Sequence, residues 1–361
     1  MSSKTRFPFL PLFLFVWLLT ACAIAPQPTA SYVWPKPPDT PRIAYELTLK
    51  NNNSLQPVES EDLLRRFATG QATAGESVLL KPYDIAAANG LIVVTDSLAG
   101  VAHVFDVRRK KMFSIGWRRE GKLSKPLGVA LDGKQNIYIV DAGRGAVVKY
   151  DRLGLYLATI GQKSDFSHIS DVAVSETGEN IYVLDRGGVG STKHQITLFN
   201  AQGIKQKIIG RRGHKTGEFN HPTQLALAKN GKIYVLDSGN FRVQVFGEQG
   251  NYEKQWGRPG NKSGNFARPR GIAVDVLNRV YVTDSAYQNF QVFNSDGQLL
   301  LAVGDGAGKD LPGRYVLPAG IAVDETQRIY VVDQVRRKVE VYRLLSPIDN
   351  NDKPQGETTI R

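Results

Sequence analysis

The sequence contains very little cysteine: Cys22 is the only one among 361 residues. A disulfide within the chain is therefore excluded, because no partner thiol exists. The chain also lacks HExxH, paired CxxC, GxxxxGK(S/T) and GxSxG, so it carries no motif of a zinc peptidase, a zinc module, a phosphate-binding loop or a serine hydrolase. The apolar run at residues 7–19 is shorter than the roughly 18–20 residues that a membrane-spanning helix needs, and two prolines interrupt it.

The N-terminal segment has the three parts of a secretory signal peptide. Lys4 and Arg6 precede the apolar run, and small residues follow it. The sequence LTAC at its end resembles the lipobox of bacterial lipoproteins, in which cleavage before the cysteine leaves a thiol that carries lipid. This resemblance makes residues 1–21 a lipoprotein signal peptide and Cys22 the lipidation site. An ordinary signal peptide with an incidental cysteine is the alternative.

Residues 22–41 contain six prolines and are expected to form an extended tether between the lipid and the folded part. Each buried lipid methylene contributes about 0.8 kcal/mol, so the several acyl chains usual for lipoproteins would give a durable membrane anchor. We therefore expect a protein of the bacterial cell envelope. Ala23 is not the aspartate that retains lipoproteins at the inner membrane in the best-studied sorting system, which favours the outer membrane.

The chain is basic, with a formal net charge of +12. Outside the cytoplasm, such a charge favours an acidic protein or an anionic glycan or lipid over nucleic acid as the partner. The charge by itself does not choose among these partners.

One pattern recurs six times from residue 81 onward, and its clearest copy is RPRGIAVDVLNRVYVTDSAYQNFQVFNSDGQLLLAVG at 268–304. Alternating apolar residues and breaks such as SDG and EQG indicate short strands joined by turns. An aspartate ends an apolar run in every copy, and successive aspartates are 44 to 52 residues apart, a period typical of propeller blades. These aspartates are Asp96, Asp141, Asp185, Asp237, Asp284 and Asp333.

The last copy ends after three strands, whereas residues 42–49 alternate like a strand and have no blade of their own. We predict that this strand completes the last blade, which gives an all-β, six-bladed propeller closed by an N-terminal strand and needs no second subunit to cover a free edge. Residues 50–80 form a connector with a short amphipathic helix at 59–68, residues 81–346 form the propeller, and residues 347–361 form a polar tail. A monomer is therefore expected.

Connectors such as GRRGHKTGEFNHP and GRPGNKSGNFARP, followed by strands such as YVLDSGNFRVQVF, resemble NHL repeats. No Trp-Asp pair closes a strand, which disfavours WD40 repeats, and the paired glycines of kelch repeats are missing. The whole chain is similar to a bacterial NHL-repeat lipoprotein. This resemblance implies a binding or scaffold role, without a cofactor, more than catalysis.

The six aspartates have two interpretations. They could form a ring of carboxylates around a cation, or each could accept backbone N–H groups from its turn and pair with a nearby arginine. Repetition favours the structural role, because a single functional site would not need six copies.

A metal-dependent hydrolase or lyase with its site in the central channel is the alternative function. Only His168 and His221 occupy equivalent repeat positions, and Asp171 could add a carboxylate. This set is too small for a three-histidine site. We therefore predict neither a metal site nor catalytic residues.

Basic residues recur just before the first strand of each copy and in the turn after the second strand. In a propeller these positions lie on one face, so surplus charge there could attract an acidic partner and clamp its carboxylates or phosphates. The alternative is that these side chains only neutralise the repeated aspartates. The predicted ligand-binding residues are Lys81, Lys125, Arg144, His168, Arg186, His221, Arg242, Arg268 and Arg336. A scaffold that uses the sides of the blades remains a third possibility.

Overall fold

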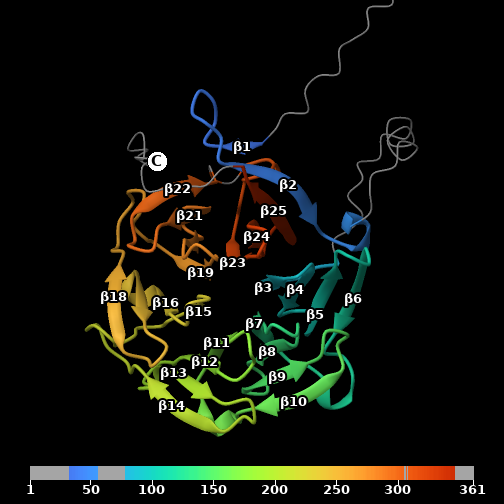
Figure 1. The fold of residues 1–361 in the computed structure, drawn as a ribbon, viewed down its shortest axis with the longest axis vertical. Coiled ribbons are helices and arrows are strands. Elements are labelled where there is room, and N and C mark those ends of the chain that lie inside the picture. Colours follow the sequence, from blue (N-terminus) through green and yellow to red (C-terminus); the bar gives the residue numbers. More distant parts are fainter. Residues whose placement is uncertain (1–31, 56–77, 305, 307, 346–361) are drawn as a thin grey trace, which may run out of the picture. The chain divides into compact units, whose positions relative to one another are not determined.

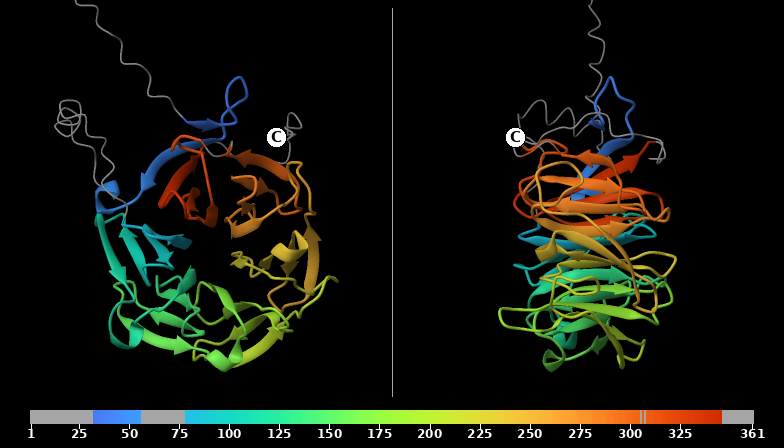
Figure 2. Two further views of the ribbon diagram at one scale, coloured as in Figure 1. Left: turned by 180° about the vertical axis from the view of Figure 1, so that it is seen from behind. Right: turned by 90° about the vertical axis from the view of Figure 1, so that its left-hand side faces the viewer.

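Six β-sheets are arranged around a central axis, and each sheet corresponds to one copy of the repeat (Figure 1). The computed structural model describes residues 32–55, 78–304, 306 and 308–345. Cys22, the predicted helix at 59–68 and the polar tail lie outside the described residues. Figure 2 shows the ring of sheets from behind and from the side. The predicted all-β, six-bladed propeller is confirmed.

The first five blades are four-stranded antiparallel sheets whose strands are consecutive in the chain. Blade one comprises β3 (Pro82–Ala88), β4 (Leu91–Asp96), β5 (Val101–Asp106) and β6 (Lys111–Ile115); blade two, β7 (Pro126–Leu131), β8 (Ile137–Asp141), β9 (Ala146–Tyr150) and β10 (Tyr156–Ile160); blade three, β11 (Ile169–Val174), β12 (Ile181–Arg186), β13 (His194–Phe199) and β14 (Lys205–Ile209); blade four, β15 (Gln224–Leu227), β16 (Ile233–Asp237), β17 (Arg242–Phe246) and β18 (Tyr252–Trp256); blade five, β19 (Pro269–Val274), β20 (Val280–Asp284), β21 (Asn289–Phe293) and β22 (Leu299–Val303).

Helical structure in the described residues is limited to short 3₁₀ turns. They are η1 (Asn52–Leu55), η2 (Arg119–Gly121), η3 (Lys163–Asp165) and η4 (Ser238–Asn240). None of them approaches the length and apolar character of a membrane-spanning helix.

Burial falls from the inner strands of a blade to its outer strand. In β20 and β21 every residue is buried, as expected for central strands covered on both faces. In β14, the outer strand of blade three, four of five residues are exposed. The inner strands therefore form the buried part of each blade, and the outer strand faces solvent.

The turns between strands use the residues that turn chemistry requires. Between β21 and β22 the Asn294 side chain accepts hydrogen bonds from the amides of Asp296 at 3.0 Å and Gln298 at 2.8 Å. Gly297 in the same turn has φ +83°, which glycine adopts without steric cost. The SDG break in the sequence is thus a hairpin turn.

The sixth blade closes the ring. Strand β2 (Ile43–Leu49) pairs antiparallel with β25 (Lys338–Leu344), with Ile43 opposite Leu344 and Leu49 opposite Val339. The sheet continues through β24 (Arg328–Asp333) to β23 (Pro318–Val323). The predicted closure by an N-terminal strand is confirmed.

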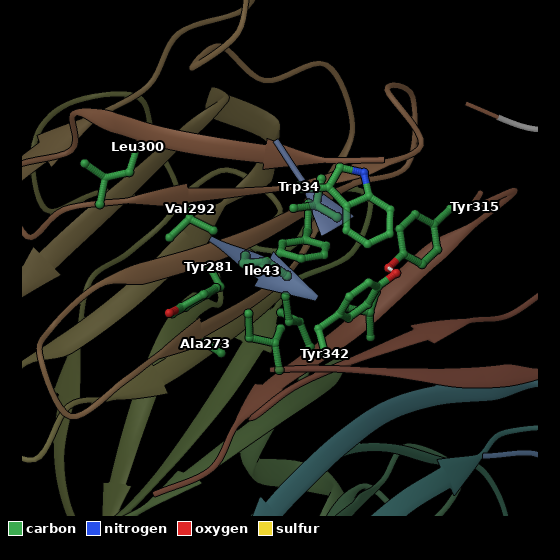
Figure 3. Packing of buried hydrophobic residues seen from close by; sticks show 13 residues of the cluster. Trp34, Ile43, Ala273, Tyr281, Val292, Leu300, Tyr315 and Tyr342 are labelled. Atoms are coloured by element: carbon green, nitrogen blue, oxygen red, sulfur yellow. Dashed lines mark hydrogen bonds between the residues drawn. The ribbon is translucent and has the colours of Figure 1, made fainter. Parts of the chain in front are cut away.

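The C-terminal part of the predicted tether is folded onto the propeller. Residues of β1 (Val33–Trp34) pair with β2 and add a fifth strand to the sixth blade. The Trp34 ring is buried and meets the Tyr342 ring edge-on at a centroid distance of 5.5 Å (Figure 3). The tether was predicted to cover residues 22–41. This prediction is wrong for Val33 and Trp34, because they form β1 and Trp34 contributes to the hydrophobic core.

In the described part of the chain the hydrophobic core consists of six clusters, and each cluster combines buried side chains of two neighbouring blades. Between blades five and six, Tyr281 and Val292 pack with Ile43 and Tyr342 (Figure 3). Apolar contact between blades therefore stabilises the ring, and β2 takes part in it.

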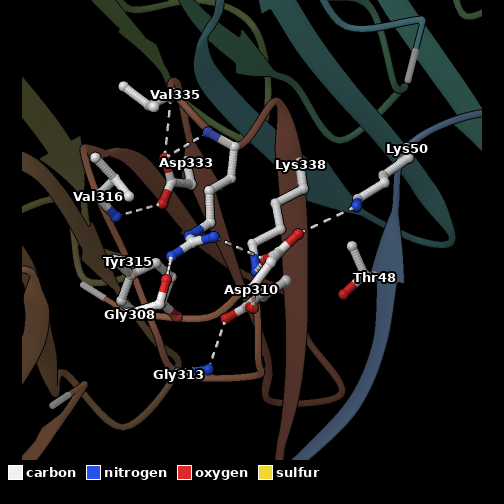
Figure 4. Close-up of polar contacts among 12 residues, drawn as sticks. Thr48, Lys50, Gly308, Asp310, Gly313, Tyr315, Val316, Asp333, Val335 and Lys338 are labelled. Atoms are coloured by element: carbon white, nitrogen blue, oxygen red, sulfur yellow. Dashed lines mark hydrogen bonds and ion pairs between the residues drawn. The ribbon is translucent and has the colours of Figure 1, made fainter. Parts of the chain in front are cut away.

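Polar contacts also attach β2 and the residue after it to the sixth blade. The Asp310 carboxylate lies 2.6 Å from Nζ of buried Lys338 and 3.4 Å from Nζ of Lys50 (Figure 4). On the outer side, Arg328 Nε lies 2.6 Å from Glu46 Oε2.

Candidate functional site

Five of the six repeated aspartates end the second strands of their blades, Asp185 is the last residue but one of β12, and all six are completely buried. Asp141 accepts hydrogen bonds from the amides of Ser124 at 2.8 Å, Lys125 at 2.9 Å and Gly143 at 3.0 Å. The equivalent aspartates also accept connector amides in their own blades. These carboxylates fasten each connector to the following turn instead of surrounding a cation. We call the side of the ring that carries these connectors and turns the connector face.

Arg242 is a structural residue. Its Nε lies 2.8 Å from Asp237 Oδ2, and its Nη2 donates to the carbonyl oxygens of Lys215 and Glu218 at 2.8 and 2.9 Å. Nη1 donates to Gln255, and only 7% of the residue is exposed. The prediction that Arg242 offers its charge to a ligand is therefore wrong, because its donors are engaged within the protein.

Arg144 and Arg336 also support connectors. Arg144 Nη2 donates to the carbonyl oxygens of Glu120 at 2.7 Å and Lys122 at 3.0 Å. Arg336 Nη2 donates to the carbonyl oxygen of Gly308 at 2.6 Å. Both residues lie three positions after their aspartate, whereas Arg242 lies five positions after Asp237, so they are not its repeat equivalents. Their guanidinium groups donate hydrogen bonds to backbone carbonyl oxygens of the connectors and are therefore not free ligand-binding groups.

The other predicted basic residues expose their side chains on the connector face. They are Lys81, Lys125, His168, Arg186, His221 and Arg268. The backbone amides of Lys125 and Arg268 donate to the repeated aspartates, which fixes these positions while leaving the side chains outside.

A cavity of about 360 Å³ opens where the first strands of the blades converge. It is lined by Tyr83, Arg186, His221, Thr223, Gln224, Ser238, Gly239, Phe241, Ala267, Arg268, Pro269, Arg270, Ala319 and Gly320. Three predicted residues, Arg186, His221 and Arg268, therefore meet at this cavity. Lys81, Lys125 and His168 are not among its lining residues.

Sequence reasoning missed Arg270 and Tyr83. Arg270 is the second residue of β19 and Tyr83 the second residue of β3, so both project from a first strand beside the cavity. The available signal was their shared position, two residues after the basic residue that precedes each blade. Polar side chains there, in strands that are otherwise apolar, could have indicated a lining role.

The cavity carries positive charge that the described residues do not neutralise. None of the described acidic side chains lies within ion-pair distance of Arg186, Arg268 or Arg270. Burial lowers the pKa of Arg270, Tyr83 opposes this shift, and the neighbouring Arg268 and Arg186 add to it. Burial raises the pKa of the Tyr83 hydroxyl, Arg270 and Arg186 oppose that shift, and the more weakly acting Asp84 and Asp171 add to it. Three guanidinium groups and a neutral phenol thus face one space.

Below the cavity, side chains reach across the channel and connect different blades. Gln224 of blade four donates to the Asp84 carboxylate of blade one, and its Oε1 accepts from the Ile272 amide at 2.8 Å. Asp84 Oδ2 accepts from the Val129 amide at 3.0 Å, and Asp171 Oδ2 accepts from the Leu225 amide at 2.8 Å. We call Asp84, Asp171 and Gln224 the channel floor.

Glycines make room for the channel floor. A Cβ on Gly128 would lie 2.0 Å from Asp171 Oδ1, and one on Gly320 would lie 2.5 Å from Asp84 Oδ1. Such contacts are too short for real Cβ atoms, so the glycines of blades two and six supply the space for the carboxylates of blades three and one.

The two carboxylates of the channel floor are poor acids. Burial raises the pKa of Asp84 to about 7, although hydrogen bonds from the Val129 and Ile85 amides oppose the shift. Burial, and then the nearby Asp84, raise the pKa of Asp171 well above its usual value. Asp171 Oδ1 is buried and has no hydrogen-bond partner among the described residues.

The donor set proposed for a channel metal is not brought together. Asp171 belongs to the channel floor, and Asp84 is occupied by the Gln224 amide and a backbone amide. His168 contacts Ser167, and the amide of His221 donates to His194 Nδ1 at 3.1 Å. Across the described ranges there is no group of three or more His, Cys, Asp or Glu side chains placed to hold a metal ion. The residues do not fit a metal site.

A second cavity, of about 460 Å³, lies at the rim between blades one and two. Trp117 lines it with 53% of its surface exposed, and the Arg118 guanidinium carbon lies 3.8 Å from the centroid of the Trp117 ring. Arg118 therefore covers part of the exposed indole through a cation–π contact.

Comparison with known families agrees with this geometry. A model of the NHL repeat matches residues 219–246, and a model described as a 6-bladed beta-propeller matches residues 275–354. The chain contains an NHL repeat in a six-bladed propeller. The matched NHL residues run from the end of a connector to the end of β17 and include Asp237 and Arg242.

Two curated relatives are similar to part of the chain. NHL repeat-containing protein 3 of Mus musculus is 27% identical over 172 residues, which cover 43% of this chain and 48% of that protein. The Homo sapiens protein of the same name is 28% identical over 124 residues, which cover 31% and 35%. The chain thus matches less than half the length of either relative.

Solved structures share the fold at low identity. A gluconolactonase from Xanthomonas campestris has a TM-score of 0.55 and 17% identity over 74% of this chain and 86% of its own. A catalytically inactive virginiamycin B lyase from Staphylococcus aureus with quinupristin has a TM-score of 0.52 and 13% identity over 73% and 95%. A protein of unknown function from Bacteroides thetaiotaomicron has a TM-score of 0.56 and 20% identity over 74% and 70%. These similarities concern the fold alone.

Proposed function

We propose that this protein is a lipid-anchored binding protein of the bacterial cell envelope, held at the outer membrane, whose connector face recognises an anionic partner. One observation carries the proposal: Arg186, Arg268 and Arg270 line one cavity. No acidic side chain of the described residues lies within ion-pair distance of them. Arginine clamps carboxylates and phosphates through paired hydrogen bonds, and crowded guanidinium groups gain from a shared anion. An acidic protein fits this chemistry, as does an anionic glycan or lipid.

Capture from detergent-solubilised envelopes tests the partner. The bait is the full chain, compared with a Lys125→Glu, Arg268→Glu variant. The matched control is Lys134→Glu, Arg152→Glu, which changes the charge equally in turns on the opposite side of the ring, at exposed positions. We expect the control to retain a partner that the first variant loses. Equal retention by both variants would contradict recognition by the connector face.

The anchor rests on Cys22, and a separate experiment tests it. We expect the mature N-terminus to be an acylated Cys22 and the Cys22→Ser protein to leave the membrane fraction, since the acyl chains supply the membrane affinity. Intact-protein mass spectrometry and fractionation measure both outcomes. An unmodified thiol in a mature, membrane-bound protein would contradict lipidation.

The hydrolase or lyase alternative has no donor set among the described residues to support it. Metal analysis of the purified full chain distinguishes the two functions. A stoichiometric divalent metal that survives dialysis would favour the enzyme.

A further inference from the structure

We infer that the cavity at the mouth of the channel is a binding site for a small organic anion with a carboxylate or phosphate head and a compact apolar body. This inference rests on the proposed function and specifies the group that the connector face recognises. The anionic head would contact Arg186, Arg268 and Arg270, and the body would lie against Phe241 and Pro269.

The cavity receives positive charge from two blades. Arg186 comes from the end of the second strand of blade three, while Arg268 and Arg270 flank the start of blade five. Because the three side chains come from two blades and line one cavity, a ligand between them meets cationic groups from more than one direction. Their mutual repulsion is relieved when an anion binds.

The cavity has hydrogen-bond donors that no described residue uses. Arg186, Arg268 and Arg270 form no side-chain hydrogen bond or ion pair with a described residue, unlike Arg242, whose donors are used. The Tyr83 hydroxyl has no described partner either and is not fully enclosed. Guanidinium N–H and phenol O–H groups all donate, so the complementary ligand atom is an acceptor, and a charged oxygen is the strongest one.

The channel floor closes the cavity on the side away from the connector face. Both polar atoms of the Gln224 amide are used within the channel floor, one with Asp84 and one with the Ile272 amide. A ligand therefore enters from the connector face and stops above Gln224. Since Asp84 and Asp171 lie below and are buried, the cationic groups are the charged side chains that line the cavity itself.

The cavity has the size of a small-molecule site and an apolar wall. A volume of about 360 Å³ lies at the lower end of the range of small-molecule sites. Phe241, Ala267, Pro269 and Ala319 supply apolar lining beside the arginines. An inorganic ion would leave this wall uncovered, whereas an anion with an aromatic or short aliphatic body would contact it.

The test is calorimetric titration of the full chain in detergent at low salt with phenyl phosphate, phenylacetate, inorganic phosphate and neutral phenol. We expect both organic anions to bind at least 10-fold more tightly than inorganic phosphate or phenol. An Arg186→Gln, Arg270→Gln variant should lose at least 10-fold in affinity, while a Lys134→Gln, Arg152→Gln control should not change. Equal affinity for the two variants, or organic anions no tighter than inorganic phosphate, would overturn the inference.

Two further measurements keep the outcome interpretable. Tyr83→Phe retains the ring and should weaken phenyl phosphate binding about 3-fold to 10-fold even if the double arginine variant is unstable. Envelope capture by Arg186→Gln, Arg270→Gln separates the two proposals: a partner lost with Lys125→Glu, Arg268→Glu but retained by this variant would uphold recognition by the connector face and overturn the cavity site.

Discussion

Gln224 of the fourth blade donates a hydrogen bond from Nε2 to Oδ1 of Asp84 in the first blade, 140 positions earlier in the chain. Because the same Gln224 side chain accepts from the Ile272 amide of the fifth blade, one residue links three blades. Contacts across the channel therefore add to those between neighbouring blades.

Replacing Gln224 by methionine should reduce the free energy of unfolding by about 1–3 kcal/mol, because a buried carboxyl group and a buried amide lose their partner at similar volume. Urea unfolding measures this change. The exposed Gln202→Met should stay within about 0.5 kcal/mol of the parent. A similar cost for both variants would mean that the contact across the channel contributes little.

The buried carboxylates predict a pH dependence of stability. The folded pKa of Asp84 is about 7, above the ordinary value of the unfolded chain, so between about pH 4 and pH 7 the folded protein holds a proton that the unfolded chain has lost. This contribution is complete below pH 4 and disappears as the pH rises through 7. The raised pKa of Asp171 acts in the same sense.

Asp171→Asn isolates this effect. The variant keeps an oxygen for the Leu225 amide and removes the charge from Oδ1, which has no described partner. We expect it to be more stable than the parent at pH 8, by on the order of 1–3 kcal/mol, and to exceed the parent by less at pH 5, where less of the proton-linked stability of the parent has been lost. Chemical unfolding at both pH values measures it. The same difference at both pH values would exclude titration of Asp171 as the cause.

Arg242→Met should destabilise the protein by about 3–5 kcal/mol, because it leaves the buried Asp237 carboxylate without its cation. Arg144→Met should cost less, since Arg144 contacts two carbonyl oxygens and a hydroxyl and is partly exposed. Thermal and urea unfolding rank the two variants. The opposite order would contradict the distinction between these arginines.

A chain that begins at residue 51 should aggregate, because removal of β1 and β2 leaves the edge of β25 unpaired. A chain that begins at residue 32 should remain monomeric by light scattering. Trp34→Ala keeps the edge covered and should lower stability by about 3–5 kcal/mol through loss of a buried aromatic ring. Equal solubility of the two shortened chains would contradict closure by β2.

The blades and their closure could be predicted from the sequence because strand alternation, turn residues and the repeat period are local signals. The burial of Trp34 could not, since it depends on Gly313, where a Cβ would lie 2.3 Å from the indole. The channel floor was missed for a related reason: Asp84, Asp171 and Gln224 are far apart in the chain and meet only when the ring forms. Their shared repeat position, with glycine in the other three blades, was the signal that could have revealed them.

The side of the ring on which the basic residues lie was easier to predict than the role of each residue. Arg186 and Arg268 lie at the cavity, but Arg242 is used by the fold, and sequence spacing alone did not separate these cases. The difference arises from carbonyl groups of the connector, which accept hydrogen bonds from Arg242 and have no fixed signature in side-chain identity.

The pairing of β2 with the last strands has a consequence for biosynthesis. Glu46 and Arg328 form their ion pair although they lie 282 positions apart, so β2 leaves the ribosome long before β24 and β25 exist. Contacts of such high sequence separation form late, because loop closure must precede them. An interrupted chain keeps β2 without its partner β25, and a prematurely terminated product therefore differs from the finished protein by an unpaired strand edge that is open to proteases and chaperones.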